Sequence, residues 1–235
     1  MFNIAYAAGH RYDTPGKRIP KALDPNETRE WQLNDRVAKY FAEAANQYDG
    51  VEILRLDDPT GKTAISVEER CEIANKWSAD FCIEIHHDAA TGKPWNGGGV
   101  TAFCKTGDKE SRKYRNEIYE SVIAAGGLRG NRAKPKQEKN YTFCVKSKAP
   151  AVLLECGFMD SRLDAPIILS EEYAKAVGYA IMDGIAQVAG LKKKPENETL
   201  YCVQVGAFKN KKYANELIKK LKNAGFDGYI TKKEN

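Results

Sequence analysis

The sequence lacks the features of membrane-spanning and disulfide-rich proteins. No apolar stretch approaches the roughly 18 to 20 residues of a membrane helix. Met1 leads straight into an apolar segment that we expect to be a core strand, so we expect no signal peptide. The six cysteines include no CxxC pair, and several lie in apolar runs, which indicates buried thiols in a reducing compartment. We therefore expect synthesis in the cytoplasm and no membrane partner.

Histidine is also scarce, and its three positions form a pattern. His10 follows the apolar run FNIAYAAG, and His86 and His87 end the run FCIEIHH. Both segments resemble buried strands. Two strands that both end in an imidazole suggest that the fold brings their ends together.

Length and charge divide the chain into two parts. At 235 residues, the chain is long enough for one domain of roughly 150 to 200 residues and a small second unit. The net charge of +5 comes from residues 192–235, which hold eleven lysines against five acidic residues. A basic module attached to a nearly neutral body usually binds an anionic polymer or surface.

Apolar and amphipathic segments alternate through residues 1–190. Buried or alternating runs predict strands at 2–8, 51–56, 81–86, 99–105, 141–146 and 151–158. Capping patterns and helical spacing predict helices that begin near residues 24, 66, 108 and 170. Strands that alternate with helices predict an α/β fold, with a mostly parallel twisted sheet and helices on both faces.

Residues 191–235 have a different composition. Residues 191–199 combine a charge run with a proline and no apolar periodicity, which indicates a linker. Residues 200–235 predict strand, helix and strand, a small α+β module. This module is shorter than the roughly 40 residues below which a unit usually needs help to fold, so we expect it to need a partner surface.

Several polar side chains come at the ends of the predicted strands. Ligands of open α/β sheets bind at the carboxyl ends of the strands, where His10, His86 and Glu155 are expected. Glu30 lies on the inward stripe of the first helix. Two imidazoles and a carboxylate are the ligand set of a catalytic zinc. Taken alone, each histidine could instead have a structural, hydrogen-bonding role. Taken alone, Glu30 could instead be a solvated residue of the helix.

Glu155 differs from the other candidates because apolar residues surround it in LLECGF. A carboxylate there needs a partner or a function, since leaving it unpaired costs several kcal/mol. Burial raises a carboxyl pKa toward the range useful for proton transfer. Glu155 is therefore a candidate general base that does not bind the metal.

Motifs in order along residues 1–190 resemble those of the zinc-dependent N-acetylmuramoyl-L-alanine amidases, which cut bacterial peptidoglycan. They are AGH, EWQLN, ERCEIAN, ADFCIEIHHDA, GGGVTAF and PAVLLECGFMDS. The resemblance implies that His10, Glu30 and His86 hold Zn²⁺ and that Glu155 is the catalytic acid/base. The reaction implied is hydrolysis of the amide between N-acetylmuramic acid and L-alanine. Glu27, one turn before Glu30, remains a competing ligand.

The chain departs from the family pattern at several positions. Glu84 stands in place of the usual serine, Asp88 in place of asparagine, and Arg11 in place of a glycine. His87 stands where the family usually has a small residue. Its side chain should point away from that of His86, so we assign it either to the wall of a substrate crevice or to a position behind the ligands.

A basic loop supplies further candidates for substrate binding. Arg129 and Arg132, with Lys134 and Lys136, are suited to hold carboxylates of the peptide stem. An ordinary solvated loop is the alternative for this segment.

The tail resembles the first half of a SPOR domain, a module that binds peptidoglycan glycan strands, through Gln204–Phe208 and its surroundings. We expect either a homodimer in which two halves pair or a truncated module. Because we expect no export signal, a wall-cutting enzyme must leave the cell by another route, and we expect a phage endolysin released through holin-made holes; a host autolysin and a mother-cell enzyme are alternatives. Rival functions are a non-catalytic wall-binding scaffold and a zinc peptidase of the peptide stem. The lysine-rich tail has no recognised nucleic-acid-binding motif.

Overall fold

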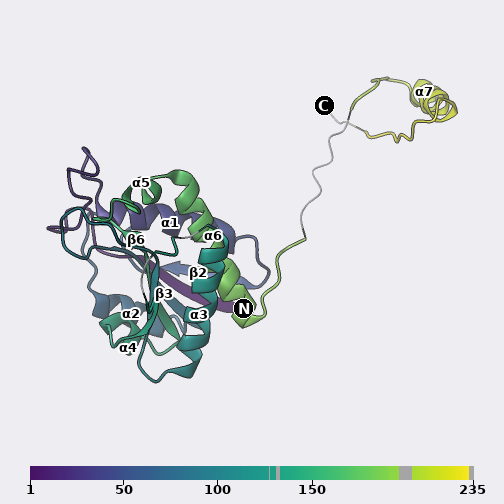
Figure 1. Cartoon of the computed structure of the whole chain (residues 1–235). Coiled ribbons are helices and arrows are strands. Elements are labelled where there is room, and N and C mark those ends of the chain that lie inside the picture. Colours follow the sequence, from purple (N-terminus) through teal and green to yellow (C-terminus); the bar gives the residue numbers. More distant parts are fainter. Residues whose placement is uncertain (127, 131–132, 196–202, 233–235) are drawn as a thin grey trace. The chain divides into compact units, whose positions relative to one another are not determined.

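The structure is a computed structural model that describes residues 1–126, 128–130, 133–195 and 203–232. The chain divides into two compact units, Met1–Lys194 and Pro195–Asn235. The first unit contains a six-stranded sheet between helices (Figure 1). Its strands are β1 (Phe2–Ala8), β2 (Val51–Arg55), β3 (Phe81–Asp88), β4 (Thr101–Cys104), β5 (Lys136–Glu138) and β6 (Ala151–Phe158).

The strand order in the sheet is β2-β1-β3-β6-β4-β5. Every pairing is parallel except that of β4 with β6. From β1 the chain moves outward to β2 and then crosses back to β3 on the other side. The strand order therefore reverses between β1 and β3, and such a reversal leaves a crevice at the carboxyl ends of the strands.

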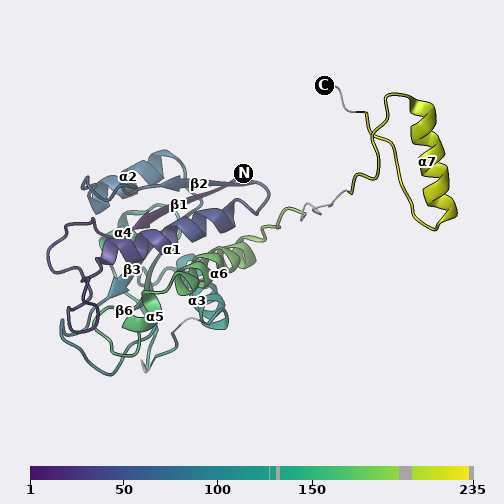
Figure 2. The same cartoon turned by 90° about the horizontal axis from the view of Figure 1, so that it is seen from above.

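Helices cover both faces of the sheet, as the sequence predicts. One face carries α1 (Glu30–Ala45), α3 (Lys109–Ala124) and α6 (Glu171–Ala189) over the larger apolar core. In this layer α1 and α6 lie side by side (Figure 2). The other face carries α2 (Val67–Lys76) and α4 (Thr142–Lys146) over a smaller core. The short α5 (Ala165–Ile168) follows β6.

The alternation of strand side chains produces the two cores. Along β3, Phe81, Ile83 and Ile85 pack into the larger core, whereas Cys82 packs into the smaller one. Glu84 and His86 share the face of Cys82 because successive side chains alternate. The polar side chains that β3 contributes near its carboxyl end therefore lie on the face of the smaller core.

The strand predicted at residues 141–146 is wrong, because this segment forms α4. The amide of Val145 donates to the Tyr141 carbonyl, and that of Ser147 donates to the Phe143 carbonyl. The turn buries Phe143 in the smaller core. A short apolar run does not distinguish a strand from one helical turn. The additional strand β5 instead forms within the basic loop.

The first helix is predicted to begin near Asp24, but in the structure it begins at Glu30. The Asp24 carboxylate accepts hydrogen bonds from the amides of Asn26 and Thr28. The capping residue therefore stabilises a turn instead of a helix, as aspartate often does. This turn places Glu30 in the first turn of α1, at the edge of the crevice.

The second unit contains α7 (Lys211–Asn223), which is the predicted helix. The Asn210 side chain caps it by accepting from the Lys212 amide. The two predicted flanking strands are wrong within the described residues, because 203–209 and 226–232 form no strand. Two short strands without a further sheet or core are marginal in water, and α7 buries no residue.

Candidate metal centre

Three side chains from three elements converge at the crevice between β1 and β3. His10 Nε2 lies 3.2 Å from Glu30 Oε1, and His86 Nδ1 lies 3.1 Å from the same oxygen. One candidate ligand atom from each of these residues lies within 4.8 Å of the others. This donor set of two imidazoles and one carboxylate suits a zinc ion with a position left open for water.

The loop after β1 has the backbone that this convergence requires. A Cβ atom on Gly9 would lie 2.1 Å from Cε1 of the His86 ring, so only glycine allows the ring to lie there. His10 itself has a φ of 63°, in the left-handed region that costs a non-glycine residue energy. Hydrogen bonds from Asn34 Nδ2 to the Gly9 carbonyl and from the Gly9 amide to the Ile85 carbonyl hold this conformation.

The charges of the cluster are strongly coupled. Burial opposes ionisation of Glu30, but contacts with His10 and His86 outweigh it and hold the pKa of this carboxyl well below its usual value. Burial likewise opposes protonation of His86, yet Glu30 and Glu84 raise the pKa of this imidazole well above its usual value. A buried anion therefore draws positive charge to this point, as expected of a cation site.

Glu155 faces His86 across the pairing of β3 with β6. Burial, with the nearby charges of Glu30 and Asp88, raises the pKa of its carboxyl to about 8, although the charge of His86 opposes this shift. Its Oε2 is buried and has no hydrogen-bond partner among the described residues. A carboxyl in this state exchanges a proton near neutral pH, which is what a general acid/base requires.

Glu27, the competing ligand, points elsewhere. Its carboxylate lies 3.1 Å from Nε of Arg18. The metal-type cluster of the described residues contains Glu30 and not Glu27. The structure thus favours Glu30 over Glu27 as the carboxylate ligand.

The sequence profile of N-acetylmuramoyl-L-alanine amidases matches residues 4–187, which include the entire cluster. The chain belongs to this family. A SPOR-domain profile matches residues 197–235. The protein is therefore a peptidoglycan amidase with a SPOR region, which gives it the bacterial cell wall as its substrate and binding partner.

Relatives and solved structures agree with this membership. A sporulation-specific N-acetylmuramoyl-L-alanine amidase of Bacillus subtilis is 30% identical over 193 residues, covering 80% of this chain and 70% of the relative. The amidase CwlM of Bacillus licheniformis is 28% identical over 188 residues, covering 79% and 69%. The catalytic domain of CwlV from Paenibacillus polymyxa superposes with a TM-score of 0.70 at 20% identity, over 82% of this chain and 100% of that domain.

His87 of the amidase lies behind the ligands rather than on the crevice wall. It is 1% exposed, and its Nδ1 lies 2.8 Å from Asn34 Oδ1. Because Asn34 Nδ2 donates to Gly9, its Oδ1 accepts, so His87 Nδ1 carries the proton. Burial lowers the pKa of His87 to about 3, which keeps it neutral. Buried in this way, His87 presents no surface to a substrate.

The basic loop is only partly described. Arg129 is exposed and lies near enough to Tyr119 of α3 for its charge to act on that phenol. Lys136 Nζ lies 2.6 Å from Glu120 Oε1. Arg132 lies outside the described residues. Substrate binding by Arg129 and Arg132 stays a prediction.

Lys17 is a member of the site that the sequence interpretation missed. Its Nζ lies 3.3 Å from Glu30 Oε2, and its charge also acts on Glu155. The only available signal was its place in the loop that follows the first strand. The Lys17 ammonium is partly exposed, so it remains accessible at the edge of the cluster.

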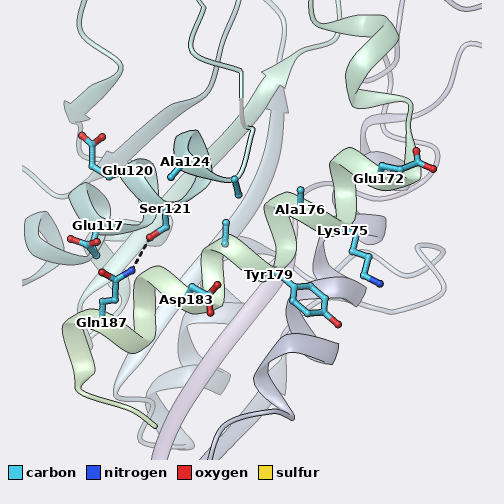
Figure 3. Close-up of a pocket in the computed structure, with 12 residues that line it drawn as sticks. Glu117, Glu120, Ser121, Ala124, Glu172, Lys175, Ala176, Tyr179, Asp183 and Gln187 are labelled. Carbon is cyan, nitrogen blue, oxygen red and sulfur yellow. Dashed lines mark hydrogen bonds between the residues drawn. The ribbon is translucent and has the colours of Figure 1, made fainter. Parts of the chain in front are cut away.

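A groove lies between α3 and α6, and its lining includes none of the candidate metal ligands (Figure 3). Its lining includes the small side chains of Ala124, Ala176 and Ala180 and four acidic residues, Glu117, Glu120, Glu172 and Asp183. The lining includes no histidine, and its acidic residues belong to no metal-type cluster among the described residues. In the described part of the amidase, no helix is long and apolar enough to cross a membrane.

Proposed function

We propose that this amidase hydrolyses the amide bond between the lactyl group of N-acetylmuramic acid and L-alanine, using Zn²⁺ held by His10, Glu30 and His86. The observation that carries the proposal is the convergence of two imidazole nitrogens on one buried carboxylate oxygen. When bound, zinc supplies an acidified water molecule and polarises the scissile carbonyl. The remaining steps depend on residues of the chain.

Glu155 is the acid/base in this proposal. Its raised pKa, about 8, allows the ionised form to take a proton from water and the protonated form to return it to the leaving amine. Its strand position opposite His86, and the action of the His86 and Glu30 charges on its carboxyl, support this role. Lys17, on the other side of Glu30, is available to hold an oxygen of the substrate.

Turbidity loss of purified cell walls tests this function. The native protein should lyse walls, lose activity on chelation, and recover with zinc, whereas Glu155→Ala should remain inactive under all conditions. Lysis that survives chelation would overturn the metal assignment. Binding without lysis on walls of several species would favour the non-catalytic scaffold.

Analysis of the released products separates the amidase from the zinc peptidase of the peptide stem. Cleavage at the lactyl amide frees the amino terminus of L-alanine, while cleavage within the stem does not. We expect new L-alanine amino termini in proportion to the loss of turbidity.

We propose that the SPOR region binds the glycan strand and that two copies pair through it. The described part of this unit exposes large apolar side chains, including Val203, Phe226 and Tyr229, that a second copy would cover. Light scattering over a range of concentrations tests this pairing. A monomer at every concentration would remove it.

We propose two routes by which the enzyme meets its substrate. The first is that of an endolysin released through holin-made holes. The name of the Bacillus subtilis relative supports the second, an enzyme of the sporulating cell itself. Transcript induction with phage lysis genes would support the first route, and induction during sporulation would support the second.

A further inference from the structure

A buried ion pair lies directly behind the two histidines of the site. Glu84 is in the middle of β3, two residues before His86 and on the same face of the sheet. Its Oε1 accepts a hydrogen bond of 2.8 Å from Nη1 of Arg70, which α2 supplies. Glu84 is 3% exposed and Arg70 is 5% exposed. Neither residue has a role in the reaction proposed above.

The pair contacts the segments that carry both histidines. The second oxygen of Glu84, Oε2, lies 3.4 Å from Nε2 of His86. This separation is at the long end of the hydrogen-bond range, and His86 Nε2 is a buried nitrogen that forms no hydrogen bond among the described residues. On its other side, Arg70 donates to the carbonyls of Ala8 and His10, each at 3.5 Å.

The two nitrogens of His86 thus face two different carboxylates. Nδ1 faces Glu30 inside the candidate metal centre, and Nε2 faces Glu84 outside it. In metal sites, the nitrogen of a histidine that does not bind the metal usually donates its proton to a carboxylate or carbonyl. That donation determines the tautomer, leaving the other nitrogen free to bind.

We propose that Glu84, held in place by Arg70, is a positioning residue that accepts the Nε2 proton of His86 and so directs Nδ1 to the metal. The inference rests on the proposed zinc site. Serine, the usual residue at this place in the motifs that the chain resembles, is two carbon atoms shorter. A glutamate on this face reaches both the ring and the guanidinium of Arg70.

The test compares the native full-length chain with three variants. Glu84→Gln keeps the shape and removes the charge. Arg70→Met/Glu84→Leu replaces both partners by apolar groups, which avoids leaving one buried charge unpaired. Asp35→Asn is the matched control, because Asp35 forms a buried ion pair with Arg55 that does not contact the histidines. Thermal melts in chelator establish that each variant folds.

Two readouts are measured on the folded proteins. Competition with a chromophoric zinc chelator gives the zinc affinity, and proton–nitrogen NMR of zinc-loaded, labelled protein reports the His86 Nε2 proton. Loss of an outer partner usually weakens metal binding about 10- to 100-fold. We expect that loss in the double variant and a smaller one in Glu84→Gln, with the Nε2 proton signal lost by exchange. Asp35→Asn should bind zinc as the native chain does.

The outcomes separate this inference from the function on which it rests. Zinc affinity of the double variant within threefold of the native value would overturn it, as would an equal loss in Asp35→Asn. If the double variant does not fold, Glu84→Gln decides the test. An unchanged zinc affinity together with an unchanged His86 Nε2 proton signal in that variant would overturn the inference. A native chain that binds no zinc would instead overturn the proposed metal centre.

Discussion

The helices α6 and α7 show how the two units of this amidase differ. Both begin at a side chain that caps them, Ser170 for α6 and Asn210 for α7. Ten residues of α6 are buried beneath its neighbours, whereas α7 buries none. Local sequence signals therefore suffice for a helix in either unit, but within the described residues the burial that stabilises strands and fixes a site occurs in the first unit alone.

The largest expected effect lies in the site that this burial creates. Glu155→Gln removes the proton-exchanging carboxyl and keeps its size, so wall lysis should fall about 10²- to 10⁴-fold. Zinc content should not change, because Glu155 is not among the ligands. Turbidity assays and metal analysis of the same preparation test both parts. Activity within a few-fold of native would assign the proton transfer to another group.

Gly9→Ala tests whether the fold of the first unit positions the ligands. The new Cβ would collide with the His86 ring, and overpacking of this kind costs about 1 to 3 kcal/mol. We expect weaker zinc binding and a lower melting temperature. Gly190→Ala is the control for an added Cβ that meets no neighbour; Gly190 has a positive φ, which Gly9 does not, so this control also includes backbone strain away from the site. Equal zinc affinity in the two variants would argue against the close approach.

A matched pair of isoleucines tests the difference between the helices directly. Ile185 of α6 is fully buried, so Ile185→Ala should destabilise the first unit by about 2 to 5 kcal/mol. Ile218 of α7 is only partly buried, and Ile218→Ala should leave the melting of the first unit unchanged. Denaturant unfolding monitored by tryptophan fluorescence measures both. A similar loss from each would show that the units stabilise one another.

The pH dependence of the metal-free protein gives the smallest effect. Because the pKa of Glu155 is raised to about 8, the folded state holds a proton that the unfolded state releases above its ordinary pKa. Stability from this group is therefore lost as pH rises from about 4.5 through about 8. Because Glu155 is partly exposed, we discount the effect for screening by solvent. We expect the free energy of unfolding to fall by about 2 kcal/mol, which corresponds to roughly 5 °C in melting temperature.

Glu155→Gln should lack this dependence, because glutamine does not titrate. Melting curves of both proteins in chelator, from pH 5 to pH 8.5, test the sign. The native chain should melt progressively below the glutamine variant as pH rises. A difference that stays constant with pH would contradict the raised pKa.

The sequence predicted those parts of the amidase in which local pattern and burial agree. The buried strands that precede His10 and include His86, and the helices that begin near residues 66, 108 and 170, form as expected. Parallel strand ends meet at one edge of a sheet, so three of the residues predicted for the site could be placed together. The inward stripe of the first predicted helix added Glu30, although this helix begins six residues later than expected.

The remaining features depend on contacts between distant segments. Residues 141–146 form a helix because Phe143 packs against the smaller core. His87 is buried because Asn34 reaches it from α1, and Lys17 reaches Glu30 from a loop. No spacing along the chain encodes these contacts. In the tail, apolar alternation predicted strands that form no pairs in the described residues.

The zinc content of three purified proteins tests the central claim most directly. Glu30→Ala removes the oxygen on which both imidazoles converge, and Glu27→Ala removes a carboxylate one turn earlier that pairs with Arg18. The account predicts one zinc per chain in the native protein and in Glu27→Ala, and loss of zinc in Glu30→Ala. Full zinc content in Glu30→Ala, or its loss in Glu27→Ala, would contradict the proposed centre.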